Sequence, residues 1–218
     1  MTDDVFRPYV RLGRRIEHAW AKTKHAKGDV FSKIATEALD ASGVHRTFDF
    51  ARFTTHIASR TKLGHQVDVR NTFSDPPITV FSNERFNIEL LTWLAPVTDV
   101  HDHGFSGAFT TLMGNTFQCS YAFDVASRYR RLVVAGTRRL VHAELVRPGN
   151  VHSIRSGARF IHAVWHLPCP SVSLVVRTHQ ERADQFGYLT HCASNTFALR
   201  READTNFAFG KQLAMLAS

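Results

Sequence analysis

The sequence predicts a mainly β protein with helices at its N-terminus and one more helix at its C-terminus. Two patterns carry this prediction. Before residue 60, apolar residues recur three and four positions apart, whereas after residue 75 short alternating segments are separated by turn residues. Many short strands at even spacing are typical of a β-sandwich or a barrel. We therefore expect a helical segment at 1–74, a β-domain at 75–180 and a C-terminal extension with a helix at 181–218.

Composition sets the broad class. The chain has 218 residues, of which 44% are hydrophobic and 17 are Phe, so it can fill the core of one good-sized domain. No apolar run approaches the roughly 20 residues of a membrane span, and Met1-Thr2-Asp3-Asp4 does not resemble a secretion signal, so we expect a cytoplasmic protein. The net charge of +8 is spread along the chain without a nucleic-acid-binding motif, which favours solvated basic faces over a nucleic-acid partner.

Three N-terminal helices are predicted, at 7–24, 31–39 and 48–58, and the terminal helix is predicted at 206–216. The first carries Val10, Ile16 and Trp20 on one face. If that stripe were exposed, the helices would form a partner-binding surface; if buried, they would pack on the β-domain.

The β-domain is predicted to begin with a hairpin formed by 78–81 and 86–93. Further strands are expected at 109–113 and 117–121, on either side of a turn at Gly114-Asn115. Two more, 131–134 and 139–142, flank a turn at 135–137, and 143–146, 160–165 and 172–176 complete the series.

The motif with most chemical content is His101-Asp102-His103. In a strand, alternate side chains share a face, so the two imidazoles would point one way and Asp102 the other. Two imidazoles on one face of a strand can bind a metal ion together with a third ligand from elsewhere in the chain. The alternative is a pair of structural histidines with no metal.

Two histidines downstream could supply the third ligand. Turns at 148–150 and 156–157 predict a hairpin with His152 on its first strand and His162 on the second. On that second strand, His162, Val164 and His166 would share a face. Spacing alone leaves His152 and His162 both open.

These residues resemble the motifs of the cupins, the double-stranded β-helix or jelly-roll barrel family. His101 and His103 match the first motif, while Gly149-Asn150, Ile154, Gly157 and His162 follow the second in order, with His166 where Asn is usual. The resemblance covers about residues 78 to 178 and favours His162 over His152. Within the cupins the likeness is to cysteine dioxygenase and related thiol dioxygenases. It rests on 86–93, His101-Asp102-His103, Gly114-Asn115 and 170–174.

The resemblance implies a mononuclear Fe(II) centre held by His101, His103 and His162, with substrate and O2 on the open positions. The glutamate that usually follows the first cupin motif is replaced here by Gly107 and Ala108, so the ligand set would be neutral. Three imidazoles leave the ion its full charge and favour an anionic donor such as a thiolate. Zinc, nickel and manganese are alternative ions.

Further site residues follow from the strand faces that, by the resemblance, look into the site. His166 is expected to act as an acid–base group, or else to make a structural hydrogen bond. Arg177 would bind an anionic group of the substrate, or else form a salt bridge, and Ser173 shares its face. Trp93 is expected to line the pocket, and Glu89, on the same face, could approach the metal.

The sequence thus predicts an iron-dependent dioxygenase that oxidises a small thiol or a similar chelating substrate. The rivals are another three-histidine cupin enzyme, either a dioxygenase that cleaves a carbon–carbon bond or a zinc hydrolase or isomerase, and a non-catalytic ligand-binding cupin. Pairing of barrels through edge strands makes a homodimer a further expectation.

Overall fold

The computed structural model describes residues 5–59, 64–67, 74–75, 77–95, 98–129, 133–182, 184–189 and 196–200. Three α-helices, α1 (Arg7–Ala21), α2 (Asp29–Ser42) and α3 (Phe50–Ala58), precede the strands. The strands are β1 (Pro77–Ser82), β2 (Phe86–Trp93), β3 (Gly107–Tyr129), β4 (Val133–Val146), β5 (Val151–Ile154), β6 (Ile161–Thr178), β7 (Phe186–Tyr188) and β8 (Thr196–Arg200). Two short 3₁₀ turns, Val44–Arg46 and Gly157–Arg159, complete the elements.

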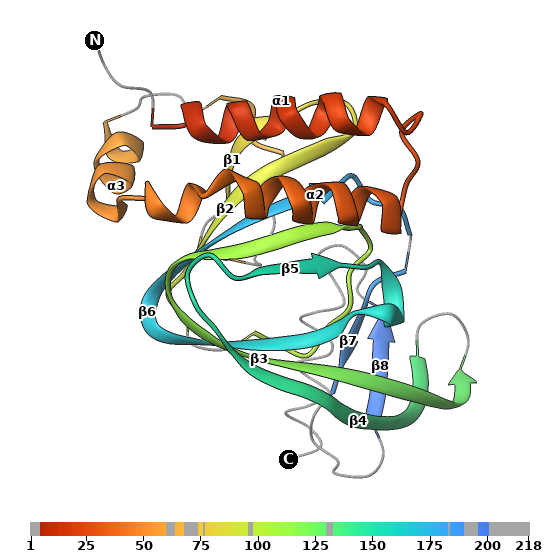
Figure 1. Cartoon of the computed structure of the whole chain (residues 1–218). Coiled ribbons are helices and arrows are strands. Elements are labelled where there is room, and N and C mark those ends of the chain that lie inside the picture. The colour runs from red at the N-terminus through yellow and green to blue at the C-terminus, as the bar shows by residue number, and fades with distance from the viewer. Residues whose placement is uncertain are drawn as a thin grey trace.

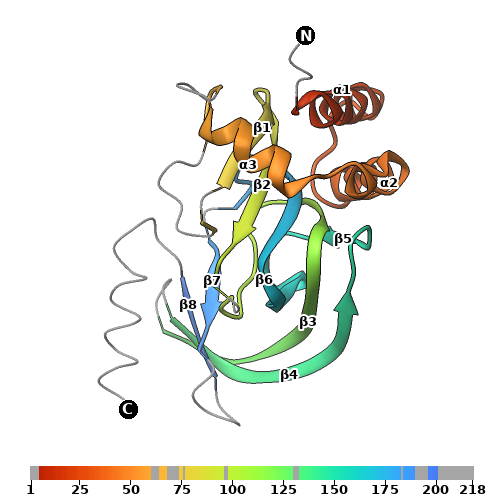
Figure 2. The same ribbon diagram turned by 90° about the vertical axis from the view of Figure 1, so that its left-hand side faces the viewer.

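All eight strands belong to one antiparallel sheet in the order β1-β2-β6-β3-β4-β8-β7, with β5 added to β3. The sheet curls strongly, because β3, β4 and β6 are long and curved (Figures 1 and 2). The prediction of a mainly β fold with N-terminal helices is confirmed. The curled antiparallel sheet is consistent with a cupin jelly roll.

The helices cover one face of the sheet. Figure 1 shows α1 and α2 side by side over the end that carries β1 and β2. Ile16 and Trp20 of α1 are 0% and 2% exposed, and Trp20 packs against Phe31 of α2 and Phe86 of β2. Ile16 and Trp20 are therefore buried, whereas Val10 of the same predicted stripe is half-buried. Burial of these two residues weakens the hypothesis that the helices are a partner-binding surface.

Two predicted turns are wrong, because β3 runs through Gly114-Asn115 and β4 runs through 135–137. Gly114 has a φ of 83° and lies where residues 168–171 bulge out of β6, between the pairs Met113↔Val172 and Asn115↔Leu167. A Cβ on Gly114 would approach the Cβ of Ser171 within 2.8 Å. This glycine bends the β3–β6 ribbon instead of reversing the chain.

The region after Thr178 contains two short strands, β7 and β8, that the sequence pattern did not predict. They pair with each other, and β8 pairs with β4. The helix predicted at 206–216 lies outside the described residues, and the division of the chain after residues 74 and 180 stays a prediction. Among the described helices, none has both the length and the apolar character that crossing a membrane requires.

Candidate metal centre

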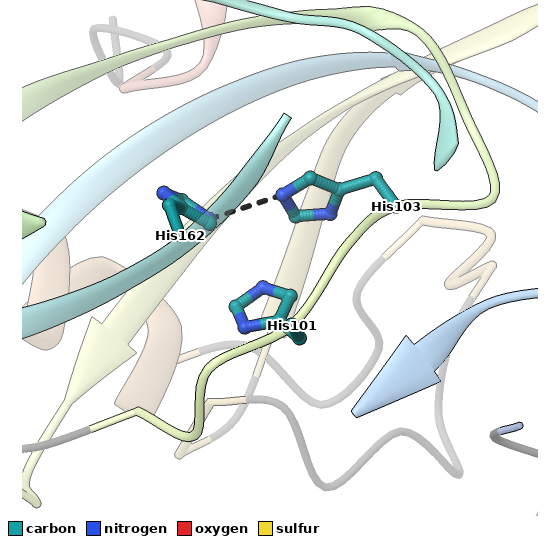
Figure 3. Close-up of side chains that lie close together, drawn as sticks. All are labelled: His101, His103 and His162. Atoms are coloured by element: carbon teal, nitrogen blue, oxygen red, sulfur yellow. Dashed lines mark hydrogen bonds between the residues drawn. The ribbon is translucent and has the colours of Figure 1, made fainter. Parts of the chain in front are cut away.

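Three histidines from two segments converge inside the curled sheet (Figure 3). His101 precedes β3, and His162 lies at the start of β6. Their backbones form an antiparallel pair with two N–H···O bonds of 2.9 Å. The ring centroids of His101, His103 and His162 lie 4.8, 4.8 and 5.0 Å apart, and one nitrogen of each lies within 4.8 Å of the others. The structure therefore brings together the three histidines selected from the sequence.

The expected strand at 101–103 is wrong in detail. Only His101 forms a β-bridge, to His162 on one side and to Gly187 on the other, and the chain then leaves the sheet. The carbonyl of His103 accepts a 2.7 Å hydrogen bond from the backbone N–H of Gly157, which fixes this loop. Both imidazoles nevertheless reach the same point.

Asp102 faces away from the imidazoles, as the alternation predicts. Its carboxylate accepts hydrogen bonds from the backbone N–H of Phe186, at 2.8 Å, and from the hydroxyl of Tyr188, at 3.1 Å. Burial and this carboxylate both raise the pKa of Tyr188. Asp102 therefore ties the histidine segment to β7 and contributes no oxygen to the centre.

Neighbouring groups orient two of the three rings. The Nδ1 of His101 lies 2.7 Å from the carbonyl of Asp99, and since a carbonyl only accepts, this nitrogen carries the proton and leaves the Nε2 lone pair available. The Nδ1 of His162 lies 3.4 Å from Oε1 of the buried Gln118 in the same way. Partners of this kind fix the tautomer of metal-binding imidazoles. Gln118 was not predicted from the sequence, although a Gln between Phe117 and Cys119 in a predicted strand is a signal that could have found it.

The chemistry of the donors fits a divalent ion. Burial lowers the pKa of His162 to about 3, with a smaller contribution from His152, so its ring is neutral as a ligand must be. The Nε2 atoms of His103 and His162 are 3.0 Å apart. Two nitrogens bound at right angles at about 2.1 Å from one ion would be about 3.0 Å apart. Within the described part of the chain, no carboxylate or thiol joins this group.

Aromatic and aliphatic side chains surround the three rings. Phe105 packs on His103 with centroids 4.8 Å apart, and Phe160 on His162 at 4.5 Å. A buried cluster continues away from them, formed by Leu91, Trp93, Phe109, Ile154 and Val175. This lining excludes water and strengthens electrostatic interactions within the site.

Glu89 and Arg177 form a buried ion pair beside this lining. Arg177 donates from Nε and Nη2 to the two carboxylate oxygens of Glu89, at 2.6 and 3.0 Å. The guanidinium also lies over the ring of Phe105, 5.2 Å from its centroid. Glu89, whose approach to the metal was left open, thus has its carboxylate bound by Arg177.

Gly107, where the resemblance to the cupins would place a glutamate, has a packing reason. Gly107 begins β3 opposite Arg177, and a Cβ here would collide with the carbonyl oxygen of Val176. The close approach of the two backbones excludes any side chain at this position, including a carboxylate.

His166, Trp93 and Ser173 form a second buried group with Ser171. The rings of His166 and Trp93 stack at 4.7 Å, and Ser171 Oγ lies 2.7 Å from the Nδ1 of His166. The Nε1 of Trp93 donates to Ser173 Oγ at 3.3 Å. Burial lowers the pKa of His166 to about 4. His166 follows His162 by four positions on β6, so this group lies further along the same strand.

His152 lies on β5, outside the three-histidine group. The hairpin predicted for the strands of His152 and His162 is wrong, because β5 and β6 each pair with β3 and not with each other. His152 is cross-strand from Phe109 and stacks on it, with centroids 5.2 Å apart.

Comparisons with known proteins give only distant similarities. No family model matches the chain, and no curated protein matches it. Among solved structures, hydroquinone 1,2-dioxygenase from Sphingomonas sp. TTNP3 with 4-hydroxybenzoate bound is 10% identical, over 51% of this chain and 70% of that one, with a TM-score of 0.37. Hydroquinone 1,2-dioxygenase PnpCD in complex with Cd²⁺ and 4-hydroxybenzonitrile is 14% identical, over 50% and 67%, with a TM-score of 0.37.

A cupin-2 domain protein from Shewanella frigidimarina NCIMB 400 is 9% identical, over 57% of this chain and 89% of that one, with a TM-score of 0.33. At this level of similarity the three proteins indicate nothing about the activity of this chain.

Proposed function

We propose that this chain is a metal-dependent dioxygenase of the cupin type that holds Fe(II) on His101, His103 and His162. The observation that carries the proposal is the convergence of three buried imidazoles with no carboxylate among them in the described residues. The substrate proposed is a small thiol or a similar chelating molecule. A neutral ligand set favours such a substrate because its donor atom becomes an anion on binding.

When bound, the ion would supply Lewis acidity and open positions for the substrate and O2. The protein's own groups prepare this chemistry. Asp99 and Gln118 hold the rings of His101 and His162 with Nδ1 turned away from the centre. Phe105 and Phe160 pack against the rings and keep bulk water from reacting groups.

The far end of the interior is proposed to hold the rest of the substrate. Trp93 and Ser173 would contact it, and His166 would exchange a proton with it or bind it through Nε2, which is buried without a hydrogen-bond partner among the described residues. Arg177 is paired with Glu89, so the two charges cancel. This pairing favours a substrate whose tail is uncharged over one with a carboxylate.

Metal identity and oxygen consumption test the proposal together. Protein purified without a histidine tag is expected to contain iron and, when Fe(II)-loaded, to consume O2 with a member of a panel of small thiols and catechols. His101→Ala should abolish both metal content and oxygen consumption. His18→Ala, at an exposed position on α1, is the matched control and should change neither.

Two outcomes would contradict the proposal. Tightly bound zinc with no oxygen consumption on the panel would favour a hydrolase or isomerase. A protein that binds no divalent ion would favour a non-catalytic cupin.

A further inference from the structure

The side of α1 that faces solvent gathers basic side chains. At about 100° of rotation per residue, six side chains project within one arc of about 100°, opposite the buried Leu12, Ile16 and Trp20. All six are exposed and basic, and we call them the basic face: Arg7, Arg11, Arg14, Arg15, His18 and, at the C-cap of the helix, Lys22. Figures 1 and 2 show α1 at the outer edge of the molecule, with α2 and the sheet to one side of it.

No carboxylate neutralises the basic face. The acidic residue of α1 is Glu17, which lies outside the arc, and its carboxylate accepts a 3.0 Å hydrogen bond from Nδ2 of Asn83. Among the described residues, no ion pair involves the Arg and Lys side chains of this face. The neighbouring α2 differs, since its Lys33 lies 3.9 Å from the carboxylate of Glu37. Positive charge is therefore left uncompensated along the exposed side of α1.

The basic face opposes the stability of its own helix. Arg11 is four positions from both Arg7 and Arg15, a spacing at which like charges repel each other. Arg7 stands in the first turn, where the helix dipole disfavours a cation, and that turn contains no acidic residue. The helix forms because its apolar side is buried. A surface that costs local stability in this way is typical of a functional site, where a partner of opposite charge compensates the cost.

The side chains of α1 discriminate between anionic partners. A helix that anchors to a membrane needs exposed apolar residues, but no large hydrophobic side chain of α1 is exposed. Single-stranded nucleic acid is bound largely by stacking of its bases on aromatic side chains, and the basic face has no Phe, Tyr or Trp. A duplex needs neither feature, because Arg and Lys contact its phosphates directly. Duplex nucleic acid is therefore the anionic partner that this surface fits best.

The length and composition of the basic face also suit a duplex. With a rise of about 1.5 Å per residue, Arg7 and Lys22 are about 22 Å apart along the helix axis. A duplex carries one phosphate charge for about every 1.7 Å of its axis, so this length offers a phosphate to every cation. Four of the cations are Arg, whose planar fork binds phosphate oxygens in pairs. The arc contains no Asn or Gln that could pair with adenine.

We propose that the basic face of α1 binds the phosphate backbone of double-stranded nucleic acid independently of its sequence. The proposal does not depend on the metal centre, and the basic face lies opposite the buried apolar stripe of α1. It differs from the expectation of solvated basic faces, which rested on charge spread along the chain. Folding of α1 places five permanent cations on one arc, and base-reading residues are not needed when the contacts are made to phosphates.

The salt dependence of binding tests the proposal. A fluorescently labelled random-sequence DNA duplex of about 20 base pairs is titrated with the full chain, and anisotropy gives the Kd at several NaCl concentrations. Five cations predict a slope of about −4.5 for log Ka against log [NaCl], which is about a 500-fold loss of affinity between about 50 and 200 mM. Arg11→Gln combined with Arg15→Gln removes two phosphate contacts, so the slope should become shallower by about 2.

Arg139→Gln combined with Arg147→Gln is the matched control. It removes the same charge from exposed positions on β4 and just after it, and should keep the slope of the wild type. The four replaced side chains are all exposed, so both double variants should keep the circular dichroism spectrum of the wild type. No binding of the duplex at about 50 mM NaCl, or equal slopes for the two double variants, would overturn the proposal. Tighter binding to vesicles of phosphatidylserine and phosphatidylcholine than to the duplex would overturn it in favour of a membrane surface.

Discussion

The buried ion pair between Arg177 and Glu89 predicts a large loss of stability when its cation is removed. The Glu89 side chain is only 4% exposed and that of Arg177 is 15% exposed. Arg177→Met keeps an unbranched apolar stem near Phe105 but leaves the carboxylate buried and uncompensated. Breaking a buried pair in this way costs about 3–5 kcal/mol. With a urea dependence of about 2 kcal/mol per molar, the unfolding midpoint should fall by about 2 M.

Urea unfolding followed by circular dichroism measures this loss. Glu89→Leu combined with Arg177→Met should restore most of the stability, because replacing a whole buried pair by apolar groups is close to neutral. The control is Arg159→Met, which breaks the ion pair with Asp29, where the side chains are 51% and 61% exposed and the N–O distance is 2.9 Å. Exposed pairs contribute about 0–1 kcal/mol. If Arg177→Met changed stability as little as Arg159→Met, the reasoning about a desolvated pair would be refuted.

Three more predictions concern the metal, an interior histidine and helix packing. The protein with the ion present at about 100 times its Kd should melt about 5–10 °C higher than the protein from which a chelator has removed the ion. In His101→Ala the chelator should not change the melting temperature. Burial lowers the pKa of His166 in the folded protein from 6.5 to about 4. As the pH falls, His166 therefore binds a proton in the unfolded chain at a higher pH than in the folded one. The free energy of unfolding should therefore fall as the pH drops from about 6.5 to 4, and in urea titrations His166→Gln should lose less over this range. Gly13→Ala should destabilise the protein in the same assay despite the better helix propensity of Ala, since its Cβ would approach the ring of Phe81 within 2.5 Å; a gain in stability would contradict that packing.

Local patterns predicted the three N-terminal helices, and the motif resemblance predicted which histidines converge. The spacing of Ile16 and Trp20 predicted the buried face of α1, and the structure buries both. His101, His103 and His162 were selected from a motif resemblance, and the structure places them together.

The strand boundaries predicted at two glycines are wrong, because a glycine can allow close packing within a strand as well as form a turn. Gly114 sits at a bulge against Ser171, and Gly136 of β4 lies against the backbone of Asp124 on the neighbouring strand β3. The sequence pattern predicts a turn at each position. The distinction depends on which strand lies opposite, and a single sequence does not show that.

Long-range partners were the other limit of the sequence. Arg177 and Glu89 are 88 residues apart, and Gln118 and His162 are 44 residues apart. Each contact follows from the register of β2, β3 and β6. A pairing of this kind is decided by tertiary structure, so local periodicity left both Arg177 and Glu89 with two possible roles.

Metal stoichiometry is the most direct test of the three-histidine centre. Elemental analysis of protein purified without a histidine tag should give about one divalent ion per chain, and His101→Ala should lose it, while His18→Ala keeps it. Metal-free wild-type protein after exposure to Fe(II) and Zn(II), or an unchanged metal content in His101→Ala, would contradict the account.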